Sequence, residues 1–74
     1  MNTEYMFNDL LSRAINAGDL TNETKELAEW FNRYDNSAWN GECYVIGDGT
    51  YLYPLYDLDK SDDIDECLIG WGIR

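Results

Sequence analysis

The residues best suited to chemistry form an acidic run at positions 57–66, with the sequence DLDKSDDIDE. Its opening, Asp57-Leu58-Asp59-Lys60-Ser61, has the Asp-x-Asp-x-Ser spacing with which an EF-hand calcium loop begins. The sixth position of such a loop should be Gly but is Asp62, and the twelfth should be a bidentate Glu but is Leu68. Two diagnostic positions fail, so we interpret the run as a solvated acidic loop without a metal site, which leaves weak association of Ca²⁺ or Mg²⁺ open.

The rest of the chain has no recognisable catalytic or cofactor-binding set. It contains no His, so the usual base of a nucleophilic triad is missing. It has neither a Gly-x-Gly-x-x-Gly fingerprint nor a P-loop, and a hairpin turn explains Gly47-Asp48-Gly49. Spacing alone leaves a carboxylate pair for glycoside hydrolysis open, but a chain this short lacks a deep cleft. We therefore expect a non-catalytic protein without a cofactor.

The charge of the chain is strongly negative. Fifteen Asp and Glu residues face five Lys and Arg residues, so the formal net charge is −10. The run at 57–66 contains six of these acids and one base, Lys60, and so carries −5, half of the total. Affinity for phosphates comes from Lys and Arg, so we expect no direct binding to DNA, RNA or an anionic membrane. The charge favours a basic protein partner, although acidic surfaces also serve solubility alone.

Composition indicates one folded domain over residues 1–74. Hydrophobic residues make up 45% and aromatic residues 15% of the chain, enough for a core and too much for a disordered acidic tail. No signal peptide or membrane span is recognisable, so we expect a cytoplasmic protein. Cys43 and Cys67 lack metal-ligand spacing and are predicted to be reduced core residues, with a disulfide as the alternative.

Two helices are expected in the first half of the chain. Over residues 3–17, apolar residues recur at the spacing of one helical face, and Gly18 suits the helix end. Residues 22–34 repeat the pattern, with Thr21 or Asn22 as the cap. The short connection predicts an antiparallel helical hairpin. Four-residue spacing predicts two ion pairs, Asp9–Arg13 and Glu29–Arg33.

Three strands are expected in the second half. Residues 42–46 and 50–56 flank the Gly-Asp-Gly turn, and residues 67–73 follow the acidic run. Pro54 cannot donate to a β-ladder and should lie near a strand end, at a bulge or on an edge. The predicted fold is α+β, with an N-terminal helical hairpin packed on one face of a C-terminal three-stranded antiparallel β-sheet.

The strand at 50–56 is apolar on both faces, and two helices can cover only one of them. One face carries Tyr51, Tyr53 and Leu55, and the other carries Leu52, Pro54 and Tyr56. The uncovered face either holds Tyr rings whose hydroxyls reach water, or forms an interface with a partner or a second copy. Pairing of an exposed edge strand would be a simple route to a homodimer.

In size, charge and aromatic richness, the chain resembles the small acidic inhibitors that phages and mobile elements carry against restriction enzymes, CRISPR effectors or repair enzymes. The resemblance implies a protein that blocks the basic cleft of a nucleic-acid-binding protein, with DNA mimicry as one means. Duplex DNA presents one negative charge per roughly 1.7 Å of its axis, and rows of Asp and Glu can present a comparable density.

The residues expected to bind the partner are mainly acidic. They are Asp57, Asp59, Asp62, Asp63, Asp65 and Glu66 in the loop, Glu23, Glu26 and Glu29 on the second helix, and Tyr51 and Tyr53 as apolar anchors. The alternative is a small regulatory or interaction module that binds a protein through the Tyr-rich sheet face or an edge strand. Salt separates these hypotheses, because screening weakens charge-led binding while aromatic-led binding persists.

Overall fold

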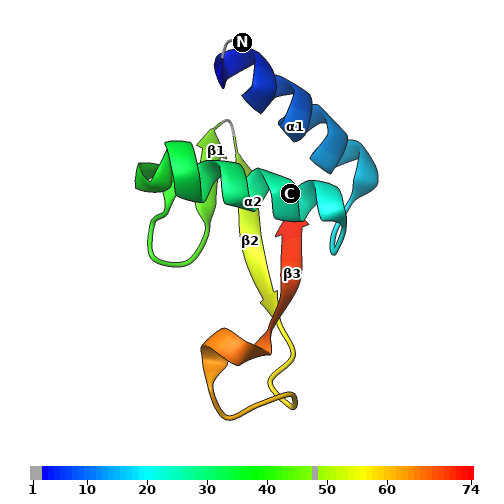
Figure 1. Ribbon diagram of the computed structural model, residues 1–74, viewed down its shortest axis with the longest axis vertical. Helices are drawn as coiled ribbons and strands as arrows, with labels where there is room; N and C mark the ends of the chain where they lie inside the picture. Colours follow the sequence, from blue (N-terminus) through cyan, green and yellow to red (C-terminus); the bar gives the residue numbers. More distant parts are fainter. Residues whose placement is uncertain (1–2, 48) are drawn as a thin grey trace.

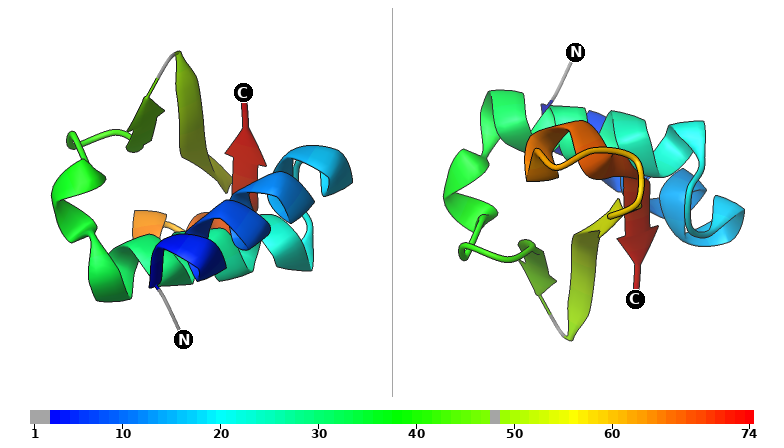
Figure 2. Two further views of the ribbon diagram at one scale, coloured as in Figure 1. Left: turned by 90° about the horizontal axis from the view of Figure 1, so that it is seen from above. Right: turned by 90° about the horizontal axis from the view of Figure 1, so that it is seen from below.

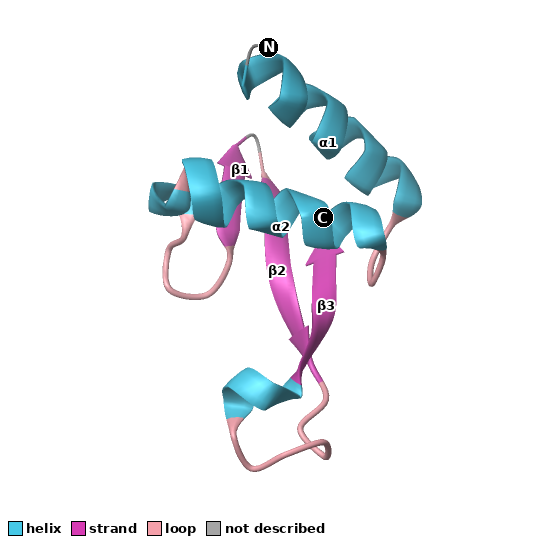
Figure 3. Cartoon of the chain, viewed as in Figure 1, coloured by secondary structure: helices cyan, strands magenta, loops and turns pink. Residues whose placement is uncertain are grey.

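The computed structural model describes residues 3–47 and 49–74 and confirms the predicted α+β order (Figure 1 and Figure 3). The elements are α1 (Thr3–Ala17), α2 (Asn22–Tyr34), the 3-10 helix η1 (Asn36–Ala38), β1 (Tyr44–Gly47), β2 (Thr50–Tyr56), the 3-10 helix η2 (Ile64–Cys67) and β3 (Leu68–Ile73). The strands form an antiparallel sheet in the order β1-β2-β3. Gly47 pairs with Thr50 at the predicted hairpin, whose Asp48 lies outside the described residues.

Both helices have the predicted bounds because local chemistry sets their ends. Gly18 adopts a φ of +87°, and its N–H donates to the Ala14 carbonyl at 3.0 Å, which ends α1. Thr21 and Thr24 form a capping box at the start of α2. The Thr21 hydroxyl oxygen accepts from the Thr24 N–H at 3.3 Å, and the Thr24 hydroxyl oxygen accepts from the Thr21 N–H at 3.2 Å. Thr24 is fully buried, so the cap also satisfies its polar side chain.

Two strand starts differ from the prediction. β1 begins at Tyr44 rather than at residue 42, because the Asn40 side-chain oxygen accepts from the N–H groups of Glu42 and Cys43 at 2.8 and 2.9 Å. β3 begins at Leu68 rather than at residue 67, because η2 extends to Cys67. Residues 42 and 43 stay out of the sheet because their N–H groups bind the Asn40 side chain. Residue 67 stays out because it belongs to a 3-10 turn.

Pro54 lies in the central strand, next to a register shift between Leu55 and Tyr56. The N–H of Tyr51 donates to the Arg74 carbonyl on the β3 side, so the backbone nitrogen of Pro54, three residues further on, points to the β1 side. β1 pairs with β2 only as far as Leu52. The missing N–H of Pro54 therefore faces a stretch without a neighbouring strand and breaks no ladder bond.

The core lies between α2 and the sheet. Leu27 of α2 and Leu52 of β2 are both 0% exposed, and burial of each side chain stabilises the fold by roughly 1.5–3 kcal/mol. The rings of Phe31 in α2 and Tyr44 in β1 stack with centroids 4.9 Å apart. α1 packs across α2, and its Ala14 is also fully buried (Figure 1). Figure 2 shows both helices on the same side of the sheet, which leaves its opposite face uncovered.

The turn between the helices covers the outer edge of β3. The Leu20 N–H donates to the Trp71 carbonyl at 2.8 Å, and the Ile73 N–H donates to the Asp19 carboxylate at 2.9 Å. Leu20 takes a φ of 59°, and its side chain lies so close to Gly70 that an added methyl group there would meet it at 2.9 Å. One of the two sheet edges is therefore occupied by the chain itself.

Candidate partner-binding surfaces

The acidic loop, residues 57–66, joins β2 to β3 at the end of the sheet away from the β1–β2 turn (Figure 1). All six predicted carboxylates belong to exposed residues: Asp57, Asp59, Asp62, Asp63, Asp65 and Glu66. The base of the loop, Lys60, forms no ion pair within the described residues. The loop therefore presents its charge of −5 to solvent without a protein counter-ion in that part of the chain.

Three of the six carboxylates hold the loop in shape. The Asp57 carboxylate accepts from the Asp59 N–H at 3.2 Å, and the Asp63 carboxylate accepts from the Asp65 N–H at 3.0 Å. The Glu66 carboxylate accepts from the Ser61 hydroxyl at 2.8 Å. By contrast, no hydrogen bond or ion pair to another described residue involves the side chains of Asp59, Asp62 and Asp65. These three carboxylates are the ones available to a partner without cost to the loop.

Buried contacts fasten the loop to the sheet. The Asp57 N–H donates to the Cys67 carbonyl at 2.8 Å, which closes the ends of the loop against each other. The buried Cys67 thiol donates to the Ser61 carbonyl at 3.0 Å. Cys43 and Cys67 are both free thiols, and Cys43 is only half-buried, so the prediction of a core position holds for Cys67 alone.

The loop does not have the surroundings of an EF-hand. A β-strand precedes it and a 3-10 helix overlaps its end, where a calcium loop would have helices on both sides. Among the side chains described, those of residues 6–47 and 49–74, no three acidic or thiol groups gather closely enough to hold a metal ion.

Two of the three glutamates of α2, Glu26 and Glu29, line one hollow beside α1, and the neighbours of the three differ otherwise. Glu26 turns toward α1, where the Arg13 guanidinium lies 3.8 Å from it and 3.0 Å from Asp9, as predicted for the latter pair. Glu23 lies in the first turn of α2, where its negative charge interacts favourably with the helix dipole. Glu29 borders a hollow of about 330 Å³ between α2 and Leu68, the first residue of β3. Glu29 therefore borders both α1 and the strand that follows the acidic loop.

The predicted ion pair between Glu29 and Arg33 is wrong. Both side chains are exposed, and neither forms an ion pair within the described part of the chain. An exposed pair of this type contributes only about 0.3–0.5 kcal/mol, which is too little to hold two long side chains in one geometry.

Tyr51 and Tyr53 lie on the sheet face opposite the helices, because Leu52 between them points into the core. Tyr51 is 42% exposed and faces Val45 of β1, its register partner, which is 40% exposed. Tyr51 precedes Asp57 by six residues, about 20 Å along an extended strand. The structure therefore places the Tyr anchors on a different face from α2 and at a distance from the acidic loop.

Tyr53 has a role within the fold. Its hydroxyl donates to the Asp19 carboxylate at 3.3 Å, and the Arg74 guanidinium carbon lies 5.5 Å from its ring centroid. The ring covers Gly72, the register partner on β3, so that an added methyl group there would collide with it. Tyr53 is thus half-buried and held from three sides, and Tyr51 is the freer of the two predicted anchors.

Several apolar residues near the acidic loop are exposed, and the sequence interpretation did not select them. Leu58 is 69% exposed and Ile64 is 50% exposed, while Tyr56 and Ile69 flank the loop in the strands and are also exposed. The sequence signal for these residues was their position between or beside acidic residues. It did not mark them as candidate contacts, because single exposed apolar residues in a polar segment are common on protein surfaces.

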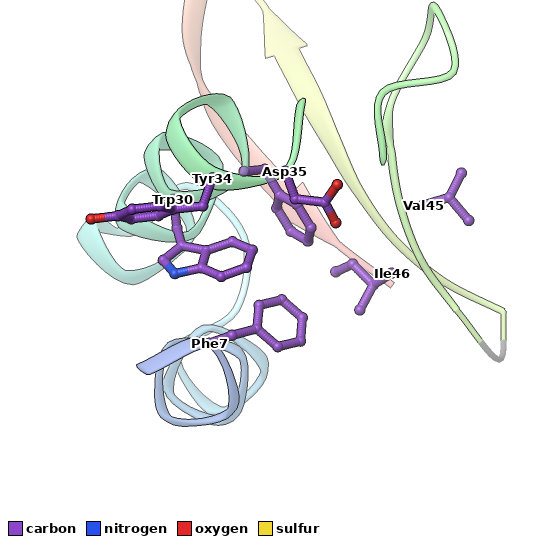
Figure 4. A pocket seen from close by; sticks show the side chains of 7 residues that line it. Phe7, Trp30, Tyr34, Asp35, Val45 and Ile46 are labelled. Atoms are coloured by element: carbon purple, nitrogen blue, oxygen red, sulfur yellow. The ribbon is translucent and has the colours of Figure 1, made fainter. Parts of the chain in front are cut away.

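A hollow of about 530 Å³ lies where α1, the end of α2 and β1 diverge (Figure 4). Its described lining consists of Phe7, Trp30, Phe31, Tyr34, Asp35, Val45 and Ile46. The Trp30 indole nitrogen is buried without a partner among the described residues, and Figure 4 shows it on the ring edge away from Ile46. Sequence patterns assigned these residues to helix faces, a turn and a strand, and could not place them around one space because that depends on the crossing angle of α1.

Neither α1 nor α2, the two described α-helices, is long and apolar enough to cross a membrane.

Comparison with known proteins identifies no relative of this chain, so a proposal for its function depends on its surfaces. No protein-family model matches the chain, and no curated protein or solved structure shows significant similarity to it.

Proposed function

We propose that this protein is a small non-catalytic inhibitor that blocks a basic nucleic-acid-binding protein of the cytoplasm by occupying its phosphate-binding cleft. The observation that supports this proposal most strongly is the exposed, unneutralised acidic loop at one end of the molecule. Its charge of −5 equals that of roughly 8–9 Å of duplex DNA axis, at one charge per roughly 1.7 Å. A cleft lined by Lys and Arg would therefore bind the acidic loop as it binds a short stretch of the DNA phosphate backbone.

The internal hydrogen bonds of the loop favour binding over mere solubility. A loop held by Asp57, Asp63 and Ser61 loses less conformational entropy on binding than a free acidic tail. Asp59, Asp62 and Asp65 can then meet Lys or Arg while the other carboxylates keep the loop in shape. Exposed apolar side chains beside them, Leu58 and Ile64, would slow dissociation once charge has guided the encounter.

The chemistry of the described residues supports a non-catalytic role. The chain has no His, and the acidic residues of the loop are exposed to water instead of lying in a cleft. The pKa of the Tyr44 phenol is raised above its ordinary value of 10.0 because the ring is buried. The ring stacks on Phe31 in the core, so this raised pKa results from packing and not from a catalytic cleft.

Capture from a lysate at two salt concentrations tests the proposal. We expect the immobilised protein to retain a nucleic-acid-binding protein at about 50 mM salt and to release it at about 200 mM or above. Adding the protein should also abolish the binding of the captured partner to DNA or RNA in a mobility-shift assay. A partner that keeps its nucleic-acid binding in the complex would refute the inhibitor proposal.

A matched pair of double variants tests the role of the loop. Asp59→Asn with Asp62→Asn removes two free loop charges, and Asp9→Asn with Glu42→Gln removes two exposed charges outside the predicted contact residues. We expect the loop variant to slow association about tenfold and the control to change it less than twofold, because charges close to the contact steer the encounter. Equal effects would mean that net charge alone governs binding and that the loop is not the contact.

One observation favours the alternative interaction module. Tyr51 and Val45 form an exposed apolar pair on the uncovered sheet face. Tyr53 and the β3 edge are already engaged within the chain and Leu55 is half-buried, so this pair is the more exposed part of the predicted sheet-face interface. If the alternative is correct, Tyr51→Ala should weaken capture more than the loop variant does, and capture should persist at high salt.

A further inference from the structure

The hollow between α1, α2 and β1 combines an aromatic wall with one carboxylate (Figure 4). The ring centroids of Phe7 and Trp30 are 4.8 Å apart, and those of Trp30 and Tyr34 are 5.6 Å apart, so the helical side is a continuous row of rings. Val45 and Ile46 line the strand side. The hollow is therefore mostly apolar and open to solvent on the side of the exposed residues.

Asp35 is the only residue of the described lining that is charged at neutral pH. Its N–H donates to the Phe31 carbonyl at 2.9 Å, and the Ser37 hydroxyl donates to one of its carboxylate oxygens at 2.7 Å. The second oxygen, Oδ2, has no hydrogen bond from the described residues. Figure 4 shows the carboxylate directed toward Val45 and Ile46, across the hollow. The backbone and Ser37 thus hold a carboxylate in place beside aromatic rings before any ligand arrives.

We propose that this hollow, the Asp35 pocket, receives an arginine side chain of the basic partner. A guanidinium group is planar, stacks on aromatic rings, pairs with a carboxylate, and is more weakly hydrated than an ammonium group. The pocket offers these two kinds of contact together and contains no competing cation in its described lining. The inference rests on the proposed function, because it takes the partner to be basic, but it uses none of the residues of the acidic loop.

Model compounds test the pocket without the partner. The ¹⁵N-labelled protein is titrated with Nα-acetyl-arginine methylamide and, separately, with the citrulline equivalent, which has nearly the same shape and no charge. We expect the arginine compound to shift the Trp30 indole resonance and to bind about tenfold more tightly than the citrulline compound, as a charge-dependent contact beside an aromatic ring requires. Equal affinities would overturn the proposal, as would arginine-induced shifts confined to residues 57–66.

Two variants and a control locate the site. Asp35→Asn keeps the shape of an exposed side chain, and Val45→Lys places a positive charge at the strand side of the pocket. Both should weaken the binding of the arginine compound about three- to fivefold, while the amide spectrum stays that of a folded protein. Asp59→Asn makes the same chemical change in the acidic loop and should leave the affinity within twofold. If Asp35→Asn has no more effect than Asp59→Asn, the arginine does not bind at Asp35.

Failure of this inference is distinguishable from failure of the proposed function. If the arginine compound does not bind but the loop double variant still slows association with the captured partner, only the pocket proposal is overturned. If the compound binds at Asp35 but Asp35→Asn leaves partner capture unchanged, the pocket is not part of the interface and its assigned ligand is wrong. Concerted loss, in which Asp35→Asn abolishes binding of the compound and weakens partner capture, supports the proposal.

Discussion

Replacing Asp19 by Ala should uncover the outer edge of β3. The carboxylate accepts hydrogen bonds from the Ile73 N–H at 2.9 Å and from the Tyr53 hydroxyl at 3.3 Å. A hydrogen bond to a charged group contributes about 1.5–3 kcal/mol, and exposure to water reduces this for Asp19, so we expect the free energy of unfolding to fall by about 1.5 kcal/mol. At about 4–8 °C per kcal/mol for a domain of this size, Tm should fall by roughly 6–12 °C.

Urea denaturation followed by Trp fluorescence measures this change. Asp19→Asn is the first control, because its amide oxygen can still accept one of the two bonds, so it should lose less than half as much stability as Asp19→Ala. Asp9→Ala is the second control, since it removes an exposed acid whose ion pair with Arg13 is worth about 0.5 kcal/mol or less. A loss below about 0.5 kcal/mol for Asp19→Ala, the size of ordinary surface effects, would refute the idea that this cover stabilises the sheet.

The same variant has a second readout. Without the carboxylate, the Ile73 N–H becomes available to another strand, so Asp19→Ala should self-associate at high concentration in light scattering more than the unmodified protein does. An unchanged mass for both proteins would mean that the remaining Leu20 contact is enough to protect the edge.

Three further perturbations probe the fold. Leu52→Ala should lower the free energy of unfolding by about 2–5 kcal/mol in urea denaturation, because the side chain is fully buried; a loss below about 1 kcal/mol would contradict its place in the core. Gly72→Ala should cost about 1–3 kcal/mol because the methyl group meets the Tyr53 ring, and a Tyr53→Ala background should remove most of that cost. Burial raises the pKa of Tyr44, so the unfolded chain ionises first and stability should fall as pH rises above 10.0; Tyr44→Phe should show a smaller fall, and an unchanged pH dependence would exclude this contribution.

The helices were predictable from sequence because their limits depend on neighbouring residues. Thr21 and Thr24 cap α2 through their own backbone, and Gly18 ends α1 by its own conformation. Strand limits were less predictable. Whether residue 42 joins β1 depends on which backbone groups the Asn40 side chain captures, and several pairings of this kind are locally possible.

The candidate sites were predictable only in part. Exposure of the acidic run follows from composition, but the division into structural and free carboxylates follows from which side chains meet across the loop, as Ser61 and Glu66 do. Sequence alternation placed Tyr51 and Tyr53 on one face correctly, yet could not show that Asp19, 34 residues earlier, binds the Tyr53 hydroxyl. The Asp35 pocket depends on the relative orientation of three elements, which no local pattern encodes.

The closed base of the acidic loop has a consequence for how this protein can change. Tyr56 and Leu68, which lie on either side of the loop and Cys67, are paired across the sheet, so a different loop can join the two strands provided that it keeps the Cys67 thiol covered, as Ser61 does now. A loop that is separable in this way can gain, lose or rearrange charges while the scaffold stays the same. If the loop is the contact, a lineage could retarget the protein to a new partner within this one segment, and a laboratory could graft the segment onto another antiparallel hairpin.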